Sequence, residues 1–234
     1  MLDLSSFNNM QLDAIREVGN IGTGNAATAL SKLLSCMIDM DVPKAELVSI
    51  YDLAGHYGDP NQQMAAVFVR SLGEFSCSLI FIQKEEDADL MVNLLLKQQF
   101  GADNIPKELP QEMSDSALTE VGNIILSSFL NAINLLIGTQ HQISVPGVAH
   151  DMLSSILDVV ASIFGQMGET ALMVNTELKV EETGDKPISG NIIMLPDPEA
   201  LELLLRKLQV LEIWRTATCL EWPTWWSPTR LRSW

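Results

Sequence analysis

Two polar triplets with the same spacing hold the side chains in this sequence that are best suited to chemistry. Each has a polar residue, a glutamate four positions later and an asparagine three positions further on: Asp13, Glu17 and Asn20, then Ser116, Glu120 and Asn123. A carboxamide offers a donor and an acceptor without titrating, so it can orient a water molecule. A carboxylate can pair with a lysine. The triplets contain neither a strong nucleophile nor a histidine base, so they favour an enzyme that completes an active site on another protein.

A helix must carry each triplet if its members are to share one face. At 100° per residue, positions i, i+4 and i+7 fall within about 60° and form a row about 10 Å long. Opposite the first row lie mostly apolar residues: Leu12, Ile15, Gly22, Ala26, Ala29 and Leu33. The second row has its own apolar partners: Leu118, Val121, Ile125 and Phe129. We predict that these stripes face a sheet and that the triplets face solvent.

A simpler interpretation is that exposed polar residues are merely solvated, with Asp13 and Ser116 serving as helix caps. The Gly-Asn pair inside each triplet argues against it, because asparagine is a poor helix former and glycine costs about 1 kcal/mol relative to alanine. The pair occurs twice in register, which favours a function, although a recent duplication would also leave two copies. The small residues 19–26, GNIGTGNA, lack the lysine of a phosphate-binding P-loop. We expect them to let the helix pack closely on the sheet or on its twin helix.

The triplets belong to a longer internal repeat. Residues 13–21, DAIREVGNI, match residues 116–124, SALTEVGNI, at six of nine positions, and Val42-Pro43 matches Val145-Pro146 at the same offset. Each half then continues with two strands around a glycine turn and a further helix: residues 64–82 and 85–98, then 169–195 and 197–208. A lone hairpin with one or two helices is rarely stable. We predict an α+β fold with a pseudo-two-fold repeat, in which one continuous antiparallel sheet carries the two long motif-bearing helices.

The domain organisation follows from this repeat. The halves, about residues 5–100 and 108–210, are joined by a polar, proline-containing linker, and we expect residues 1–211 to form a single domain. Residues 212–234 hold all five tryptophans of the chain without a helical or strand period. This tail is either an aromatic docking segment or a non-native, disordered end, and the break in composition favours the second interpretation.

Composition excludes several classes of function. A net charge of −16 disfavours nucleic acid and anionic membranes as partners. The three cysteines and three histidines are scattered without metal-ligand spacing, so we expect no metal site on the chain and a reducing, cytoplasmic location. The apolar segment 123–138 is short and interrupted by polar residues, which predicts no membrane insertion. The internal repeat already supplies two-fold symmetry, so we expect a monomer.

The doubled pattern Asp/Ser-xxx-Glu-xx-Asn, followed by glycine or small residues, resembles the motif of the CheC/CheX/FliY family. These are bacterial chemotaxis phosphatases that act on the aspartyl phosphate of the response regulator CheY. The resemblance covers about residues 5–210. Two motifs instead of the one in CheX, and no added C-terminal switch domain as in FliY, make the chain most similar to the CheC type.

The resemblance implies a role for each triplet member. The asparagines would orient the attacking water, the glutamates would pair with the regulator's conserved lysine, and the variable first residues would add contacts or caps. The catalytic residues would be Glu17, Asn20, Glu120 and Asn123, and the substrate-binding residues Asp13 and Ser116. CheY would supply Mg²⁺, so the chain needs no cofactor of its own, and the deamidase CheD would be a second partner. The alternative is a non-catalytic adaptor, CheD-regulating or part of the flagellar switch, that only docks phosphorylated CheY.

Overall fold

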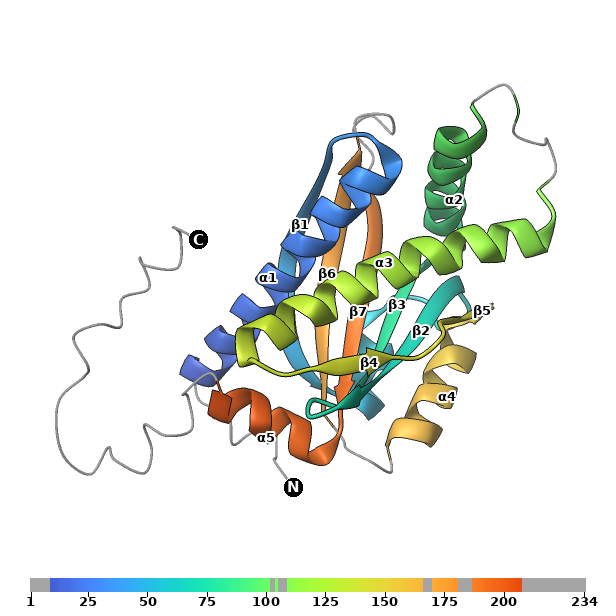
Figure 1. The fold of residues 1–234 in the computed structure, drawn as a ribbon. Coiled ribbons are helices and arrows are strands. Elements are labelled where there is room, and N and C mark those ends of the chain that lie inside the picture. Colours follow the sequence, from blue (N-terminus) through green and yellow to red (C-terminus); the bar gives the residue numbers. More distant parts are fainter. Residues whose placement is uncertain (1–8, 102–103, 105–108, 166–169, 181–186, 208–234) are drawn as a thin grey trace, which may run out of the picture.

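Figure 1 shows the protein as a computed structural model that describes these parts of the chain: residues 9–101, 104, 109–165, 170–180 and 187–207. The Trp-rich tail and the turn expected around Gly184-Asp185 lie outside the described residues. The elements, in chain order, are α1 (Asn9–Leu34), β1 (Ile38–Ser49), the 3₁₀-helix η2 (Ile50–His56), β2 (Gln63–Gly73), β3 (Cys77–Lys84), α2 (Glu85–Phe100), α3 (Gln111–Ile137), β4 (His141–Ile143), β5 (Gly147–Met152), α4 (Leu153–Phe164), β6 (Thr170–Val180), β7 (Ile188–Pro196) and α5 (Pro198–Lys207).

The strands form one seven-stranded antiparallel sheet, which confirms the predicted fold class. Its order is β1-β6-β7-β3-β2-β4, and β5 also pairs with β2. The two predicted hairpins, β2–β3 and β6–β7, meet in the middle through the β3–β7 pair. At the edges the halves exchange strands, because β1 pairs with β6 while β4 and β5 pair with β2. A pseudo-two-fold axis between β3 and β7 therefore relates the two halves.

Both copies of the repeated Val-Pro dipeptide interrupt an outer edge of the sheet. Val42-Pro43 lies in β1, where the register with β6 shifts between Asp41 and Lys44. Val145-Pro146 lies in the break between β4 and β5. Proline has no backbone N–H for a ladder and is restricted to edges and bulges. The repeat thus places matching breaks on the two edges.

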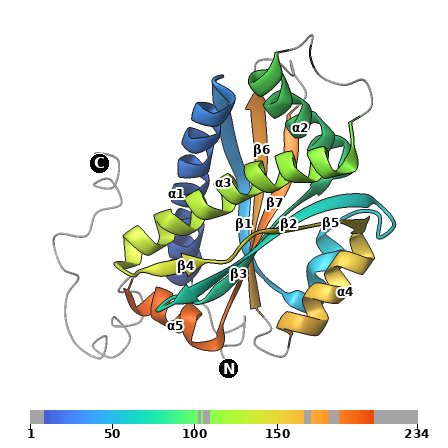
Figure 2. The same ribbon diagram turned by 45° about the vertical axis from the view of Figure 1, so that its right-hand side comes forward.

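Helices cover both faces of the sheet (Figures 1 and 2). α1, α2, α3 and α5 pack on one face over the larger core, whose buried side chains include Val18, Leu30, Val67, Phe81, Leu95, Val121, Phe129 and Leu204. η2 and α4 cover the other face over a smaller core that includes Leu53, Ile80, Leu157 and Ile193. The two motif-bearing helices, α1 and α3, therefore both pack on the sheet, as predicted, and the structure adds that they lie on the same face.

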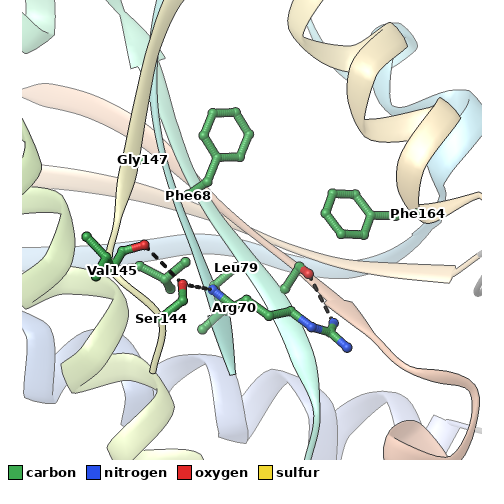
Figure 3. Close-up of a pocket in the computed structure, with 9 residues that line it drawn as sticks. Phe68, Arg70, Leu79, Ser144, Val145, Gly147 and Phe164 are labelled. Carbon is green, nitrogen blue, oxygen red and sulfur yellow. Dashed lines mark hydrogen bonds between the residues drawn. The ribbon is translucent and has the colours of Figure 1, made fainter. Parts of the chain in front are cut away.

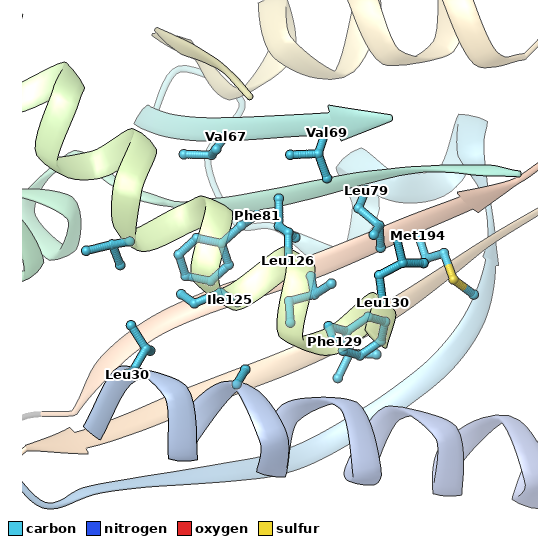
Figure 4. Packing of buried hydrophobic residues seen from close by; sticks show 14 of the residues in the cluster. Leu30, Val67, Val69, Leu79, Phe81, Ile125, Leu126, Phe129, Leu130 and Met194 are labelled. Carbon is cyan, nitrogen blue, oxygen red and sulfur yellow. The ribbon is translucent and has the colours of Figure 1, made fainter. Parts of the chain in front are cut away.

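Small residues bring α1 against its twin helix and the sheet. A Cβ added at Gly22 would lie 2.4 Å from the ring of Phe129 on α3. At Gly19 a Cβ would lie 3.4 Å from Ala45 of β1 and from Val174 of β6. In Figure 4 Phe129 lies with its neighbours on α3 between the sheet and α1. Gly22 thus permits the close packing predicted for residues 19–26, whereas Gly19 makes an ordinary contact and Gly24 faces open space.

Among the described residues, α3 has the length and composition that a membrane-crossing helix requires, so the expectation that this segment is too short, drawn from residues 123–138, was wrong. Its apolar side chains, among them Val121, Ile125 and Phe129, are fully buried inside the fold. Glu120 lies on the exposed side of the same helix. These are the properties of a core helix.

Candidate functional site

Each triplet lies on one continuous helix, so its three positions share one face. All members of the first triplet are exposed, as are Ser116 and Glu120, while Asn123 is half-buried. Asp13 is the fifth residue of α1 and Ser116 the sixth of α3, so neither caps its helix. The capping interpretation is therefore wrong, since each helix begins more than a turn earlier than the triplets suggest.

The predicted apolar stripe of α3 is confirmed, because all four of its residues are buried. The stripe of α1 is only partly as expected. Gly22 and Ala26 are buried, whereas Ala29 and Leu33 are half-buried and the side chains of Leu12 and Ile15 lie outside the described residues. The buried face of α1 also takes in further apolar residues: Val18, Ala27, Leu30 and Leu34. The buried face of α1 is therefore shifted from the predicted stripe and wider than it, because α1 packs against α3 as well as against the sheet.

The two asparagine carboxamides are available to a ligand. Neither Asn20 nor Asn123 makes a side-chain hydrogen bond to another described residue. Asn134, about three turns further along α3 than Asn123, is different. It is buried, donates to the carbonyl of Leu130 at 2.8 Å and accepts from Thr139. Asn134 thus has a structural role that Asn20 and Asn123 lack. Their donor and acceptor groups remain free to hold water.

Packing explains one of the two glycines that precede the asparagines. A Cβ on Gly122 would lie 2.6 Å from Cβ of Val67 in β2, and Gly19 faces the sheet at 3.4 Å. Packing therefore accounts for Gly122, whereas a Cβ at Gly19 would make only ordinary van der Waals contacts, so packing does not require that glycine. Neither asparagine carboxamide bonds to another described residue, so the evidence for function lies in the asparagine and glutamate positions.

A cation that the motif does not specify lies beside the first triplet. The Arg16 guanidinium donates to Asp13 Oδ1 at 3.0 Å, and the two side chains are 58% and 71% exposed. Arg16 is four residues before Asn20 and so lies next to it on the helix surface. The sequence could have indicated this cation, because Arg16 lies about one helical turn before the candidate Asn20.

The second triplet has different neighbours. Glu120 accepts from Gln99 Nε2 of α2 at 3.4 Å. Thr119 occupies the position that Arg16 holds in the first copy. Close by, His150 Nδ1 of β5 lies 2.8 Å from Glu85 of α2, and its Nε2 lies 3.2 Å from Asp115 of α3. His150 therefore fastens α2 and α3 to the sheet edge, and this contact could not be read from the sequence.

The buried thiol of Cys77 in β3 lies outside both triplet helices. Burial raises the pKa of the Cys77 thiol to about 12, so it is protonated at neutral pH and is not a nucleophile. Among the described residues, no group of three acidic, histidine or cysteine side chains could hold a metal ion.

A cavity of about 240 Å³ lies at the break between β4 and β5 (Figure 3). Phe68 of β2 and Phe164 of α4 line it, and none of its lining residues belongs to α1 or α3. Its cation, Arg70, is already bound to Ser78 at 3.1 Å and to Asp197. Because Asp197 precedes α5, this contact links the two halves of the repeat.

The sequence model of the CheC-like family matches residues 10–47 and again residues 113–150. The two matches have the same offset as the triplets. The chain is similar to the CheY-P phosphatase CheC of Bacillus subtilis (strain 168), with 34% identity over 205 residues, 86% of this chain and 96% of that protein. It is also similar to the flagellar motor switch phosphatase FliY of that organism, with 27% identity over 58% of this chain and 32% of that protein.

Among solved structures, FliY of Thermotoga maritima has a similar fold. It matches with a TM-score of 0.67 at 19% identity, over 87% of this chain and 98% of that one. The likeness concerns the arrangement of helices on a curled antiparallel sheet.

Proposed function

This chain belongs to the CheC-like family, and from that premise we propose that it hydrolyses the aspartyl phosphate of a CheY-type response regulator. The observation that carries the proposal is a repeated helix face with an exposed glutamate and an asparagine whose carboxamide bonds to no other described residue; Asn20 of α1 is exposed and Asn123 of α3 is half-buried. The curated relatives are named as phosphatases, and one of them covers nearly the whole chain.

In this mechanism the glutamate binds the regulator and the asparagine positions the attacking water. Glu17 or Glu120 pairs with a lysine of the regulator and places α1 or α3 over the phosphoryl group. The carboxamide of Asn20 or Asn123 then holds a water in line with the phosphorus. The water oxygen bonds to phosphorus as the phosphorus–aspartate bond breaks, which yields phosphate and a free carboxylate. Mg²⁺ and the reactive bond belong to the regulator.

The proposal has three further parts that rest on the sequence. The protein works in the cytoplasm, where response regulators are phosphorylated. It acts as a monomer, because the repeat supplies two docking faces in one chain. CheD is its second partner, as the family resemblance implies.

Reversing the charge of both docking glutamates tests the proposal. In the chain carrying Glu17→Lys and Glu120→Lys, each face presents a cation to the partner lysine, and like charges repel. We expect the affinity for phosphorylated CheY to fall at least about tenfold, and phosphate release at subsaturating substrate to fall with it. Titration of labelled regulator and a phosphate-release assay measure the two quantities.

Glu74→Lys is the matched control, because Glu74 is exposed in the turn between β2 and β3 and lies outside both triplets. It makes one such charge reversal away from the triplets and should leave affinity and turnover within twofold of the original values. Unchanged binding and turnover in the doubly reversed chain would show that the proposed ion pairs are wrong.

A further inference from the structure

The two repeated faces differ in charge although their motifs match. α1 carries two cationic residues, Arg16 and Lys32, whereas the 27 residues of α3 include neither lysine nor arginine. Arg16 lies within the face of the first triplet, between Asp13 three residues before it and Asn20 four residues after it. The corresponding residue of the second face is the neutral, half-buried Thr119.

The Asp13–Arg16 contact can be exchanged at little cost. Both side chains are more than half exposed, and ion pairs between exposed side chains are weak because water and salt screen them. A phosphoryl group and its surrounding carboxylates offer a denser negative charge than one solvated aspartate. Arginine binds such oxygens with two or more N–H donors in a planar fork.

We propose that Arg16 is a substrate-contacting residue of the first face. When the regulator docks, the Arg16 guanidinium exchanges its contact with Asp13 for contacts with the anionic phosphoryl region of the regulator. The helix of the second face, α3, carries no such cation, and Ser116 and Asn123 are neutral, so Glu120 is the charged member of its triplet. This inference rests on the proposed function and adds that the two faces are unequal. The first face binds the phosphorylated regulator more tightly and loses more of that affinity as salt concentration rises.

Single-face variants separate the two contributions. Asn123→Ala leaves the first face active, and Asn20→Ala leaves the second. In the Asn123→Ala chain, Arg16→Gln should raise KM for phosphorylated CheY about tenfold, the usual effect of one charge-assisted hydrogen bond. kcat should stay within about twofold, and the dependence of KM on salt should flatten. Arg16→Lys, which keeps the charge but not the fork, should recover the salt dependence and part of the affinity.

The matched control is Lys32→Gln, which removes the other cation of α1 from an exposed position outside the triplet face. It should change KM less than twofold in either background, and Arg16→Gln should likewise have no effect in the Asn20→Ala chain. An unchanged KM for Arg16→Gln in the Asn123→Ala chain, or an equal rise in both backgrounds, would overturn this inference and leave the proposed function standing. Full activity in the chain with both asparagines replaced would overturn the proposed function and this inference with it.

Discussion

The chain with Asn20→Ala and Asn123→Ala is expected to hydrolyse the regulator's aspartyl phosphate at least about 100-fold more slowly than the original protein. Alanine leaves the attacking water unheld, and removal of one positioning group commonly costs about that factor. Each single change should remove part of the activity, because the other face remains intact. The measurement is the rate of phosphate release at saturating phosphorylated CheY.

This loss should leave folding and docking intact. Neither carboxamide bonds to another described residue, so unfolding free energy should change by about 0.5 kcal/mol or less. Affinity for the regulator should stay within a few fold, since Glu17 and Glu120 remain. A near-isosteric pair, Asn20→Asp and Asn123→Asp, should also be inactive, because a carboxylate repels the phosphoryl oxygens.

The matched control replaces the exposed asparagines elsewhere on the same two helices. Asn25 of α1 and Asn131 of α3 are both exposed and lie outside the triplets. The chain with Asn25→Ala and Asn131→Ala should keep its full rate. A folded chain that lacks Asn20 and Asn123 yet still accelerates phosphate loss would refute the catalytic role and favour the adaptor alternative.

The second large effect is expected in stability. Gly22→Ala and Gly122→Ala each introduce a methyl group at the closest approaches of the motif helices, 2.4 Å from the Phe129 ring and 2.6 Å from Val67. Both neighbours are fully buried, and valine is stiff at χ1. Overpacking of this kind costs about 1 to 3 kcal/mol or more, which outweighs the helix-propensity gain of about 1 kcal/mol. We expect each change to lower the free energy of unfolding by about 2 kcal/mol.

Gly24 provides the control on the same helix as Gly22. It is exposed, and a Cβ there would meet nothing within 4 Å. Gly24→Ala should therefore raise the free energy of unfolding by about 0.5 to 1 kcal/mol, because alanine restricts the unfolded chain and favours the helix. Urea denaturation of the three variants measures these differences. Equal effects at Gly22 and Gly24 would contradict the close helix contact.

Much of the fold could be predicted because the chain contains two copies of one pattern. The alternating hydrophobic residues and the glycine turns predicted both hairpins, and the apolar stripe of α3 predicted its buried face. The strand pairing at the sheet edges is harder to predict from sequence, since β1 pairs with β6 from the opposite half of the chain. Nothing in the sequence indicated that η2, between β1 and β2, and α4, between β5 and β6, would cover the second face of the sheet.

The candidate site, like the fold, could be predicted only in part from the sequence. Helical spacing predicted that each glutamate and asparagine would share an exposed face. The neighbours that make the faces unequal come from tertiary structure or from outside the motif: Gln99 reaches Glu120 only because α2 packs on α3. The local Asp13–Arg16 pair has the spacing of a helical ion pair and could have been recognised.

The most direct test of the account is loss of phosphate from phosphorylated CheY in the presence of a tenth as much of this chain. We expect the decay rate to rise in proportion to the concentration of the chain and all of the regulator to be dephosphorylated, which requires each molecule to turn over several times. A decay rate equal to that of the regulator alone, under conditions where binding is measurable, would contradict the account.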